Sequence, residues 1–228
     1  MTDTTSLAQI PGYVAGAWSI DPVHSEVGFS VRHMMVSKVR GKFKTFTGEL
    51  VTGENPLASS VTAEIDLTSI DTGNAQRDDH IRSADFFEVE TYPTMTYASA
   101  GIREDGDGFI LDGELTLKGV TRSVPLKLEL NGFGPDPFGG TRAGFTATGE
   151  LNRRDFNVNF SAPMQNGGVV VADKITLHLE IEAVLQTASL RSCPAPTVGG
   201  KNRDRTERDG PGPRHPPRAR GHFAVPVA

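Results

Sequence analysis

The chain has 228 residues, of which 37% are hydrophobic, and its mean hydropathy is −0.29. This length suits one domain with a sizeable core and a tail, and no run approaches the roughly 18 apolar residues of a membrane-spanning helix. The net charge of −5 is unevenly distributed, because residues 186–228 hold eight Lys or Arg against three Asp or Glu. The remaining body is strongly acidic, which argues against nucleic acid as a partner.

The two ends of the chain are predicted to lie outside the folded domain. Residues 1–16 lack the basic segment and continuous apolar run of a signal peptide, so we expect an N-terminal arm and a cytoplasmic location. Residues 187–228 are rich in Pro, Arg and Gly, which predicts a disordered tail. A basic tail can contact nucleic acid or anionic lipid, although a solvated tail is the simpler interpretation. The single Cys193 cannot form an internal disulfide and fits a reducing compartment.

Between these ends, apolar side chains recur at every second position, which predicts β-strands with one dry and one solvated face. The clearest alternating runs are, in chain order, residues 27–33, 63–67, 109–117, 124–130, 143–151 and 175–185. Turn sequences separate them: Gly53-Glu54-Asn55-Pro56, Asp105-Gly106-Asp107-Gly108 and Lys118-Gly119-Val120-Thr121. Longer loops are expected at residues 131–140 and 165–168.

Residues 74–87 are the exception to the strand pattern. Their apolar side chains are loosely spaced as in a helix, which Asp71 or Thr72 could cap. About eight antiparallel strands with one helical insertion predict an all-β, mainly antiparallel fold, either a sandwich or a closed barrel. The dry faces carry many small residues, which favours a barrel around a cavity for one small ligand. Small inward residues that merely pack against bulky neighbours are the alternative.

The run Asp78-Asp79-His80 is the most conspicuous candidate for a reactive or metal-binding cluster. Consecutive residues of a helix point about 100° apart, so these three side chains cannot converge on one ion. A zinc-protease motif would need a second histidine one helical turn away, and the chain has none there. Asp78 lies four residues before Arg82, which predicts a surface ion pair. A solvated face is therefore expected, with a polar contact from His80, Arg77 or Arg82 to a ligand headgroup as the alternative.

Two further patterns bear on a binding site. His33 shares the inward parity of its strand and is expected to be a hydrogen-bonded core residue more readily than a ligand contact. Residues 38–44 place Lys or Arg at every second position, so they form one cationic face that could attract a phosphate or protect an exposed sheet edge. Nucleophile elbows, phosphate-binding loops and dinucleotide-binding motifs do not occur in the sequence.

Several stretches form a specific combination when taken in order. They are WSIDPVHSEVGFSVRHMMVSKVRGKF (18–43), RDDHIRSADFFEVETYP (77–93), GELTLKGVTRSVPL (113–126), RRDFN (153–157) and DKITLHLEIEA (173–183). This combination resembles the YceI-like family, also called the polyisoprenoid-binding or lipid-binding YceI domain. The resemblance covers about residues 17–185, whereas the tail has no counterpart in the family pattern.

The resemblance implies an extended, lipocalin-like, eight-stranded β-barrel over residues 17–186. Its interior would hold a long-chain isoprenoid, quinone or fatty acyl lipid. The resemblance implies no catalytic residue, metal or cofactor, and homodimers are common among members of the family. Together with the inward His33, the residues expected to contact the ligand are Val27, Phe29, Val31, His33, Phe43, Ile65, Leu67, Arg77, Asp78, His80, Leu115 and Leu117. The three residues of the helical insertion either touch a headgroup or hold the helix on the barrel.

Binding, storage or transport of an isoprenoid or another long-chain amphiphilic lipid is the function that these observations favour. One alternative is an enzyme that acts on a small lipid-like substrate through His33 or His80. Another is a stress-response module that works through protein contacts and whose cavity is incidental.

Overall fold

The computed structural model of the chain describes residues 10–34, 36–106, 108–137, 139–162 and 170–186. The predictions for the N-terminal nine residues, for the 165–168 loop and for the tail with Cys193 lie outside these ranges. Among the residues that the structure describes, we find no helix with the length and apolar character that crossing a membrane requires.

The described residues form twelve strands, one α-helix and three short 3₁₀ helices. The strands are β1 (Gly16–Ile20), β2 (Glu26–His33), β3 (Ser37–Phe43), β4 (Phe46–Thr52), β5 (Ser60–Asp66), β6 (Ile70–Asp71), β7 (Thr94–Asp105), β8 (Gly108–Leu117), β9 (Val120–Ser123), β10 (Leu126–Pro135), β11 (Thr141–Asn152) and β12 (Val171–Leu185). The helices are η2 (Pro56–Ala58), η3 (Leu67–Ser69), α1 (Ala75–Arg82) and η4 (Arg153–Phe156).

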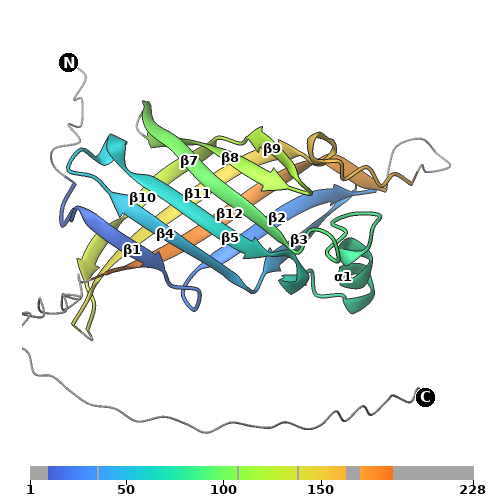
Figure 1. The fold of residues 1–228 in the computed structure, drawn as a ribbon, viewed down its shortest axis with the longest axis horizontal. Helices are drawn as coiled ribbons and strands as arrows, with labels where there is room; N and C mark the ends of the chain where they lie inside the picture. The colour runs from blue at the N-terminus through green and yellow to red at the C-terminus, as the bar shows by residue number, and fades with distance from the viewer. Residues whose placement is uncertain (1–9, 35, 107, 138, 163–169, 187–228) are drawn as a thin grey trace, which may run out of the picture. The chain divides into compact units, whose positions relative to one another are not determined.

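Eight of the strands close into a barrel. Their order is β1-β4-β5-β7-β8-β10-β11-β12, and β1 pairs with β12 to complete the ring (Figure 1). Every pairing is antiparallel. The predicted lipocalin-like eight-stranded barrel with one short helix is therefore confirmed.

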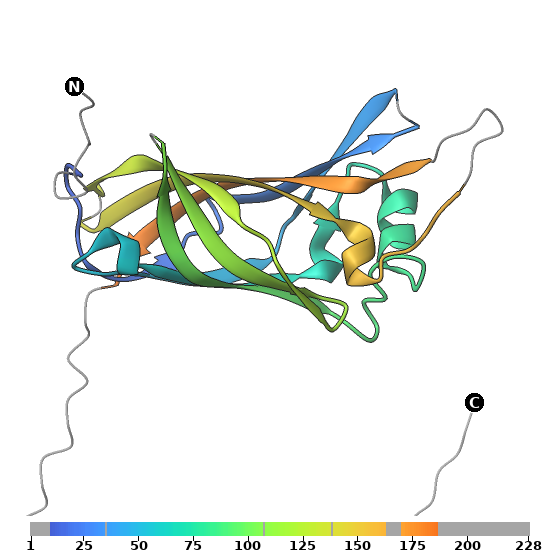
Figure 2. The same ribbon diagram turned by 90° about the horizontal axis from the view of Figure 1, so that it is seen from above.

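The barrel extends beyond this ring because β12 carries two strands along one edge. The C-terminal end of β12 pairs with β1, and most of its other residues pair with β2. β2 pairs in turn with β3, and β3 pairs with β6. β1 and β2 thus act as one interrupted strand beside β12, and β4 and β3 pair with them as a second interrupted strand. In both ribbon views this extension reaches the end of the barrel where α1 lies (Figures 1 and 2).

The end of the barrel away from α1 is filled by a small apolar cluster around Trp18. The Trp18 side chain is buried with Ala143 and Ala183, and Phe133 packs edge-on against its ring. Its indole N–H donates a 2.8 Å hydrogen bond to Oγ1 of Thr52 on the neighbouring β4. The only tryptophan of the chain therefore plugs this end with its polar atom satisfied.

Strand alternation determines which side chains face inward. On β8, Leu111, Leu115 and Leu117 are buried, whereas Glu114 is exposed. The short turn between β8 and β9 follows the predicted hairpin, because Lys118 and Gly119 both have positive φ, as a tight two-residue turn requires.

The predicted loop at residues 131–140 is wrong in its extent. β10 continues to Pro135 and β11 begins at Thr141, with a register shift between Leu130 and Gly132. Gly132 has a φ of 139°, a conformation that other residues rarely adopt. Gly132 and Gly134 thus belong to the bulged end of β10, whereas Gly139 and Gly140 lie in the short connection to β11.

The helical insertion is shorter than predicted. α1 ends at Arg82, and the chain from residue 83 to residue 92 consists largely of turns. Asn74 caps the helix by accepting a 2.9 Å hydrogen bond from the Arg77 N–H. The predicted caps, Asp71 and Thr72, were wrong, because their side chains bond elsewhere. Asp71 accepts a hydrogen bond from the Gly73 N–H, and the Thr72 hydroxyl donates to the carboxylate of Asp78.

A testable consequence concerns Gly113 on β8, which has no room for a side chain. A Cβ there would clash with the hydroxyl of Tyr97 and lie 2.9 Å from the carbonyl oxygen of Ala98. We expect Gly113→Ala to lower the free energy of unfolding by about 1–3 kcal/mol in urea titrations, because Tyr97 must move. Gly134→Ala is the control, since a Cβ there meets nothing within 4 Å. Equal stability of both variants would contradict the packing of Tyr97.

Candidate functional site

The barrel contains a cavity of about 470 Å³. This volume lies in the range of small-molecule binding sites. Its wall is built mainly from the inward apolar side chains of strands on all sides, such as Phe29 of β2, Leu115 of β8 and Leu177 of β12. Ala63 and Ala147 also line it, and their small side chains leave space that larger ones would fill. The composition of the dry faces thus has two outcomes: Ala63 and Ala147 line a cavity, whereas Ala143 and Ala183 pack against Trp18, as the alternative interpretation expected.

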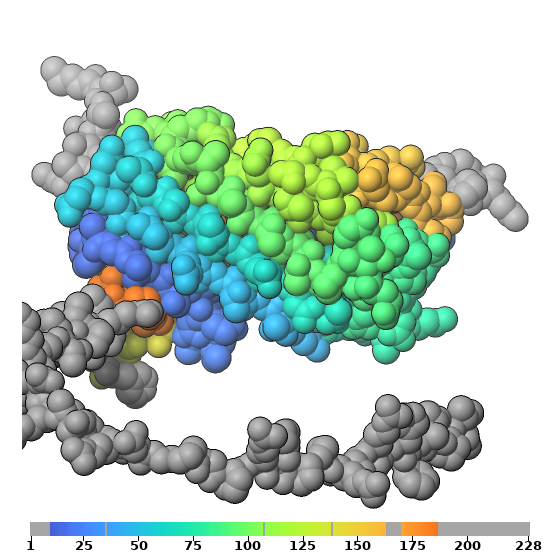
Figure 3. Space-filling view, viewed as in Figure 1, coloured from blue at the N-terminus to red at the C-terminus, as the bar shows by residue number. Residues whose placement is uncertain are grey.

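Basic side chains gather at the α1 end of this cavity. Arg32 and His33 come from the end of β2, Arg77 and His80 from α1, and Arg153 from η4. The ribbon views place these elements together at one end of the barrel (Figures 1 and 2), and the residues of α1 and the turns after it cover part of that end (Figure 3). None of the described residues that line the cavity is acidic. The described residues that line this end of the cavity are thus basic and not acidic, although Asp173 and Asp85 contact Arg153 and His80 from outside the wall.

Arg153 is the most deeply buried of these cations, with 3% of its surface exposed. Its guanidinium donates to the carbonyl oxygens of Val158, Ala172 and Val171 and to the Asp173 carboxylate. Burial lowers the pKa of Arg153, and Asp173 opposes that shift. Since four acceptors already engage the guanidinium, the main work of Arg153 is to hold η4 against the start of β12.

Asp78 and Arg77 hold the start of α1 through Thr72. The buried Asp78 carboxylate accepts hydrogen bonds from the Thr72 N–H at 3.0 Å and from its hydroxyl at 2.5 Å. The Arg77 guanidinium donates to the Thr72 hydroxyl at 2.7 Å and to its carbonyl oxygen at 2.8 Å. Arg77 also lines the cavity, whereas Asp78 does not.

His80 lies between the cavity and solvent. Its Nε2 is 2.7 Å from a carboxylate oxygen of Asp85. Its ring packs edge-on against Phe86 and Phe160, with ring centroids 5.1 Å and 4.9 Å away. Aromatic contacts thus fix the imidazole at the cavity wall, where it leaves one ring nitrogen for another contact.

Ten of the twelve residues predicted to contact a ligand line the cavity. They are Val27, Phe29, Val31, His33, Phe43, Ile65, Arg77, His80, Leu115 and Leu117. The two others face elsewhere. Leu67 begins η3 instead of continuing β5, because Asp66 caps that helix by accepting from the Thr68 N–H, and Leu67 is fully buried in the core. Asp78 is used to fix the helix, as described above.

Among the basic residues of the cavity wall, sequence reasoning missed two, and it also misassigned one ion pair. Arg32 lies on the solvated parity of β2 and Arg153 lies in a 3₁₀ helix, so alternation gave no signal for either. The expected pair of Asp78 with Arg82 is not formed. Arg82 instead pairs with Asp79 at 2.9 Å.

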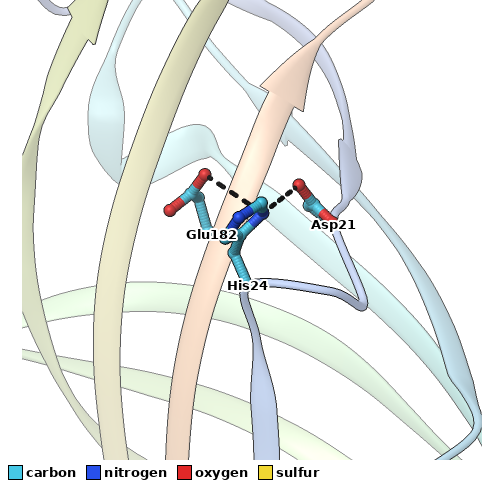
Figure 4. Close-up of side chains that lie close together, drawn as sticks. All are labelled: Asp21, His24 and Glu182. Atoms are coloured by element: carbon cyan, nitrogen blue, oxygen red, sulfur yellow. Dashed lines mark hydrogen bonds and ion pairs between the residues drawn. The ribbon is translucent and has the colours of Figure 1, made fainter. Parts of the chain in front are cut away.

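A second polar cluster lies outside the cavity, where the β1–β2 connection crosses β12. Asp21, His24 and Glu182 each offer a ligand atom, and these atoms lie within 4.8 Å of one another (Figure 4). However, the guanidinium of Arg142 bonds to both carboxylates and also to Asp136. Because a cation already neutralises these acids, the cluster is an ion-pair network.

This network fixes the break between β1 and β2. The Asp21 N–H donates to the carbonyl oxygen of Glu182 at 2.8 Å. The Ser25 hydroxyl accepts from the Glu182 N–H at 2.9 Å and can donate to its carbonyl oxygen at 3.2 Å. The conspicuous Asp and His-Ser residues of the first sequence stretch thus hold two strand segments on one edge of β12.

Comparison with known proteins gives one family. The chain matches the model of the YceI-like domain over residues 18–183. Protein YceI of Escherichia coli is 44% identical over 148 residues, which cover 64% of this chain and 78% of that protein. A UPF0312 protein of Photorhabdus laumondii is 42% identical over 135 residues, or 59% of this chain and 70% of that protein.

Solved structures share the fold. The YCEI protein of Campylobacter jejuni superposes with a TM-score of 0.59 at 28% identity, covering 73% of this chain and 96% of that one. A polyisoprenoid-binding domain from Saccharophagus degradans has a TM-score of 0.55 at 15% identity, covering 76% of this chain and all of that one. At that identity the second likeness shows the barrel architecture alone.

Asp78 and Asp79 are neighbours in sequence, and we expect them to respond differently to substitution. Asp78→Ala leaves buried donors of Thr72 without an acceptor and should lower the free energy of unfolding by about 1–3 kcal/mol. Asp79→Ala removes a surface ion pair from a side chain that is 77% exposed, so its effect should stay within about 1 kcal/mol. Urea titration of both variants measures the difference, and similar losses would contradict the anchoring of α1 by Asp78.

The network around Asp21 predicts a pH dependence of stability. Hydrogen bonds with His24 and Arg142 hold the pKa of Asp21 well below its usual value of 3.8. Because the folded state favours the ionised carboxylate of Asp21, this group stabilises the fold fully above pH 3.8. That stabilisation is lost progressively as the pH falls below 3.8 and the carboxylate takes up a proton. We expect Asp21→Asn to be less stable than the natural chain at pH 7, with the difference narrowing steadily below about pH 4. A difference that stays constant over pH 7 to 3, measured by urea unfolding, would contradict this account.

Proposed function

The chain belongs to the YceI-like family, and we propose that it binds one long-chain isoprenoid lipid inside the barrel. The observation that carries the proposal is the cavity of about 470 Å³, which has an apolar wall and basic groups at one end only. An empty cavity of this kind is unfavourable, because the apolar side chains that line it have no packing partners on one side.

The course of the cavity favours a linear ligand over a compact one. Residues of β12 from Val171 to Ile181 line it, and a strand of that length extends about 30 Å. Near the far end the wall includes Ile20 and Phe145, whereas His80 lies at the α1 end. A flexible hydrocarbon chain can follow such a path, and a bulky polycyclic molecule cannot fill it evenly.

The energetics also favour a long chain. Each buried CH₂ group contributes about 0.8 kcal/mol, so about twenty buried carbons contribute roughly 16 kcal/mol. Association costs an estimated 4–15 kcal/mol, so about 1–12 kcal/mol of favourable free energy remains before any polar contact is counted. Specificity then comes from chain length and from the headgroup.

The ligand class is supported by the fold relative from Saccharophagus degradans, which is described as a polyisoprenoid-binding domain. We infer that the polar head of the lipid lies at the α1 end, near Arg77 and His80, and that the tail points toward Trp18. Storage or transport of the lipid follows from such an arrangement, because the barrel shields the hydrocarbon chain from water.

The proposal is tested on the full chain by extracting the purified protein with organic solvent and analysing the extract by mass spectrometry. A polyprenyl species at about one equivalent per chain is the expected result. A quinone or a fatty acyl lipid would keep the cavity as the site but change the ligand class. An extract without lipid, together with no uptake of an offered polyprenyl alcohol or phosphate, would refute the proposal.

A change in cavity volume should alter lipid uptake without unfolding the barrel. Ala147→Phe places a ring in the cavity between β10 and β12, and we expect at least a ten-fold loss of affinity for an offered polyprenyl lipid. Ala98→Phe adds the same ring on the exposed face of β7 and serves as the control. Circular dichroism should be native for both variants. Unchanged uptake by a folded Ala147→Phe would show that the lipid binds elsewhere.

A further inference from the structure

The hairpin between β2 and β3 presents apolar side chains to solvent at its tip. Val36 is 83% exposed and Met34 is 41% exposed, and they lie on either side of the turn. Met34 has a φ of 50°, in the left-handed region that residues with a side chain rarely adopt. The tip therefore combines a strained turn with apolar groups that bury nothing within the barrel.

Unpaired cations surround this tip. Arg32, Lys38 and Arg40 are exposed, and within the described part of the chain none of them has an ion-pair partner. Arg32 lies directly opposite Lys38 in the β2–β3 register. Like charges in directly opposed positions destabilise a sheet, so the hairpin keeps an unfavourable pair that an external anion would relieve.

The predicted cationic face of β3 divides into two parts. Near the barrel Lys42 pairs with Glu26 at 3.1 Å, and just beyond β3 Lys44 pairs with Asp71 at 2.7 Å. Toward the tip, Lys38 and Arg40 have no such partner. The outer edge of β3 is paired with β6 only at Lys42 and Phe43. Cations along the open edge oppose the addition of another strand or of a second copy of this chain, since that copy would bring the same charges.

The same hairpin belongs to the basic end of the cavity. Arg32, His33 and Val39 line the cavity as well as forming the hairpin. Figure 2 shows β2 and β3 projecting from the barrel at the α1 end. A surface that contacts the tip therefore lies next to that end of the cavity.

We propose that the β2–β3 tip docks onto an anionic phospholipid bilayer. Met34 and Val36 enter the boundary between headgroups and acyl chains, and Arg32, Lys38 and Arg40 bind lipid phosphates. Apolar groups ringed by cations are the combination that anchors proteins at such surfaces, since neither burial nor charge alone gives firm attachment. The docking goes beyond lipid binding in the cavity, and it supplies the place where a lipid can leave the membrane and enter the barrel.

The opposite end of β2 supplies a matched control. Val23 is 82% exposed, almost the same as Val36, but the charged groups around it are paired, since Asp21 bonds to Arg142 and Glu26 to Lys42. No unpaired cation of the described residues 21–26 attracts an anionic bilayer there, so the two valines separate the effect of charge context from that of exposure.

The first experiment is co-sedimentation of the full chain with vesicles of phosphatidylglycerol and phosphatidylcholine, compared with phosphatidylcholine alone. We expect binding to the anionic vesicles that weakens as salt is added. Val36→Ser should weaken it, and Lys38→Gln with Arg40→Gln should weaken it by about five-fold for each charge removed. Val23→Ser and the charge-matched Arg122→Gln with Lys127→Gln, both exposed on β9 and β10, should bind like the natural chain apart from a small uniform loss.

The second experiment separates the tip from the basic tail, which can attract anionic vesicles by itself. In a Cys193→Ser background, Val36→Cys and Val23→Cys are each labelled with a polarity-sensitive fluorophore. A blue shift on adding anionic vesicles is expected at position 36 and not at position 23. This signal reports local insertion, so binding through the tail does not produce it.

Three results would overturn the docking proposal. They are no sedimentation with anionic vesicles, sedimentation without a shift at position 36, and a dimer in solution that Val36→Ser disrupts while vesicles are not bound. None of these results bears on whether a lipid binds in the cavity, which mass spectrometry of the extract tests separately. Conversely, vesicle docking by a chain that yields no lipid on extraction and takes up no offered polyprenyl lipid would refute lipid binding in the cavity and leave the docking intact.

Discussion

The pairing of β12 with two successive strands along one edge is the constraint on which the rest of the structure depends. β12 spans fifteen residues, and β1 and β2 divide its outer edge between them. Closure through β1 completes the eight-stranded ring, while β2 carries the sheet past the ring toward α1. Without this division the barrel would be shorter, and it would have no separate hairpin at its basic end.

The break between β1 and β2 needs its own support, because two strand ends meet there with unpaired backbone groups. Hydrogen bonds to the backbone of Glu182 satisfy several of these groups. The guanidinium of Arg142 pairs with the carboxylates of Asp21 and Glu182 at the same place. At the other end, Asp78 and Arg153 serve a similar purpose for α1 and η4. The most conspicuous polar motifs of the chain thus stabilise connections, and the cavity wall is left almost entirely apolar.

The placement of polar groups at the connections and of apolar groups at the cavity wall explains how the barrel can keep an internal cavity. Polar networks outside the cavity fix the connections, so small side chains such as Ala63 and Ala147 can line the interior without collapse of the fold. The cations that do reach the cavity come from segments at one end. The interior therefore has a polarity along its length, which suits an amphiphilic ligand held in one direction.

The alternation of apolar residues determined the strands and their inward faces, because it has a fixed period and each apolar face must be buried, but it left open whether the strands form a sandwich or a barrel. The resemblance of the ordered motifs to one family pointed to the barrel and to residues such as Phe29 and Leu115 as part of its lining, and both residues line the cavity. The extent of the 131–140 segment could not be read from composition, because glycine serves a bulge as well as a loop. Tertiary structure alone decided that Asp78 fixes Thr72, that Arg153 reaches the cavity and that Arg32 faces Lys38. Those contacts join residues whose side chains are brought together by strand register and by the position of a helix, which local sequence does not specify.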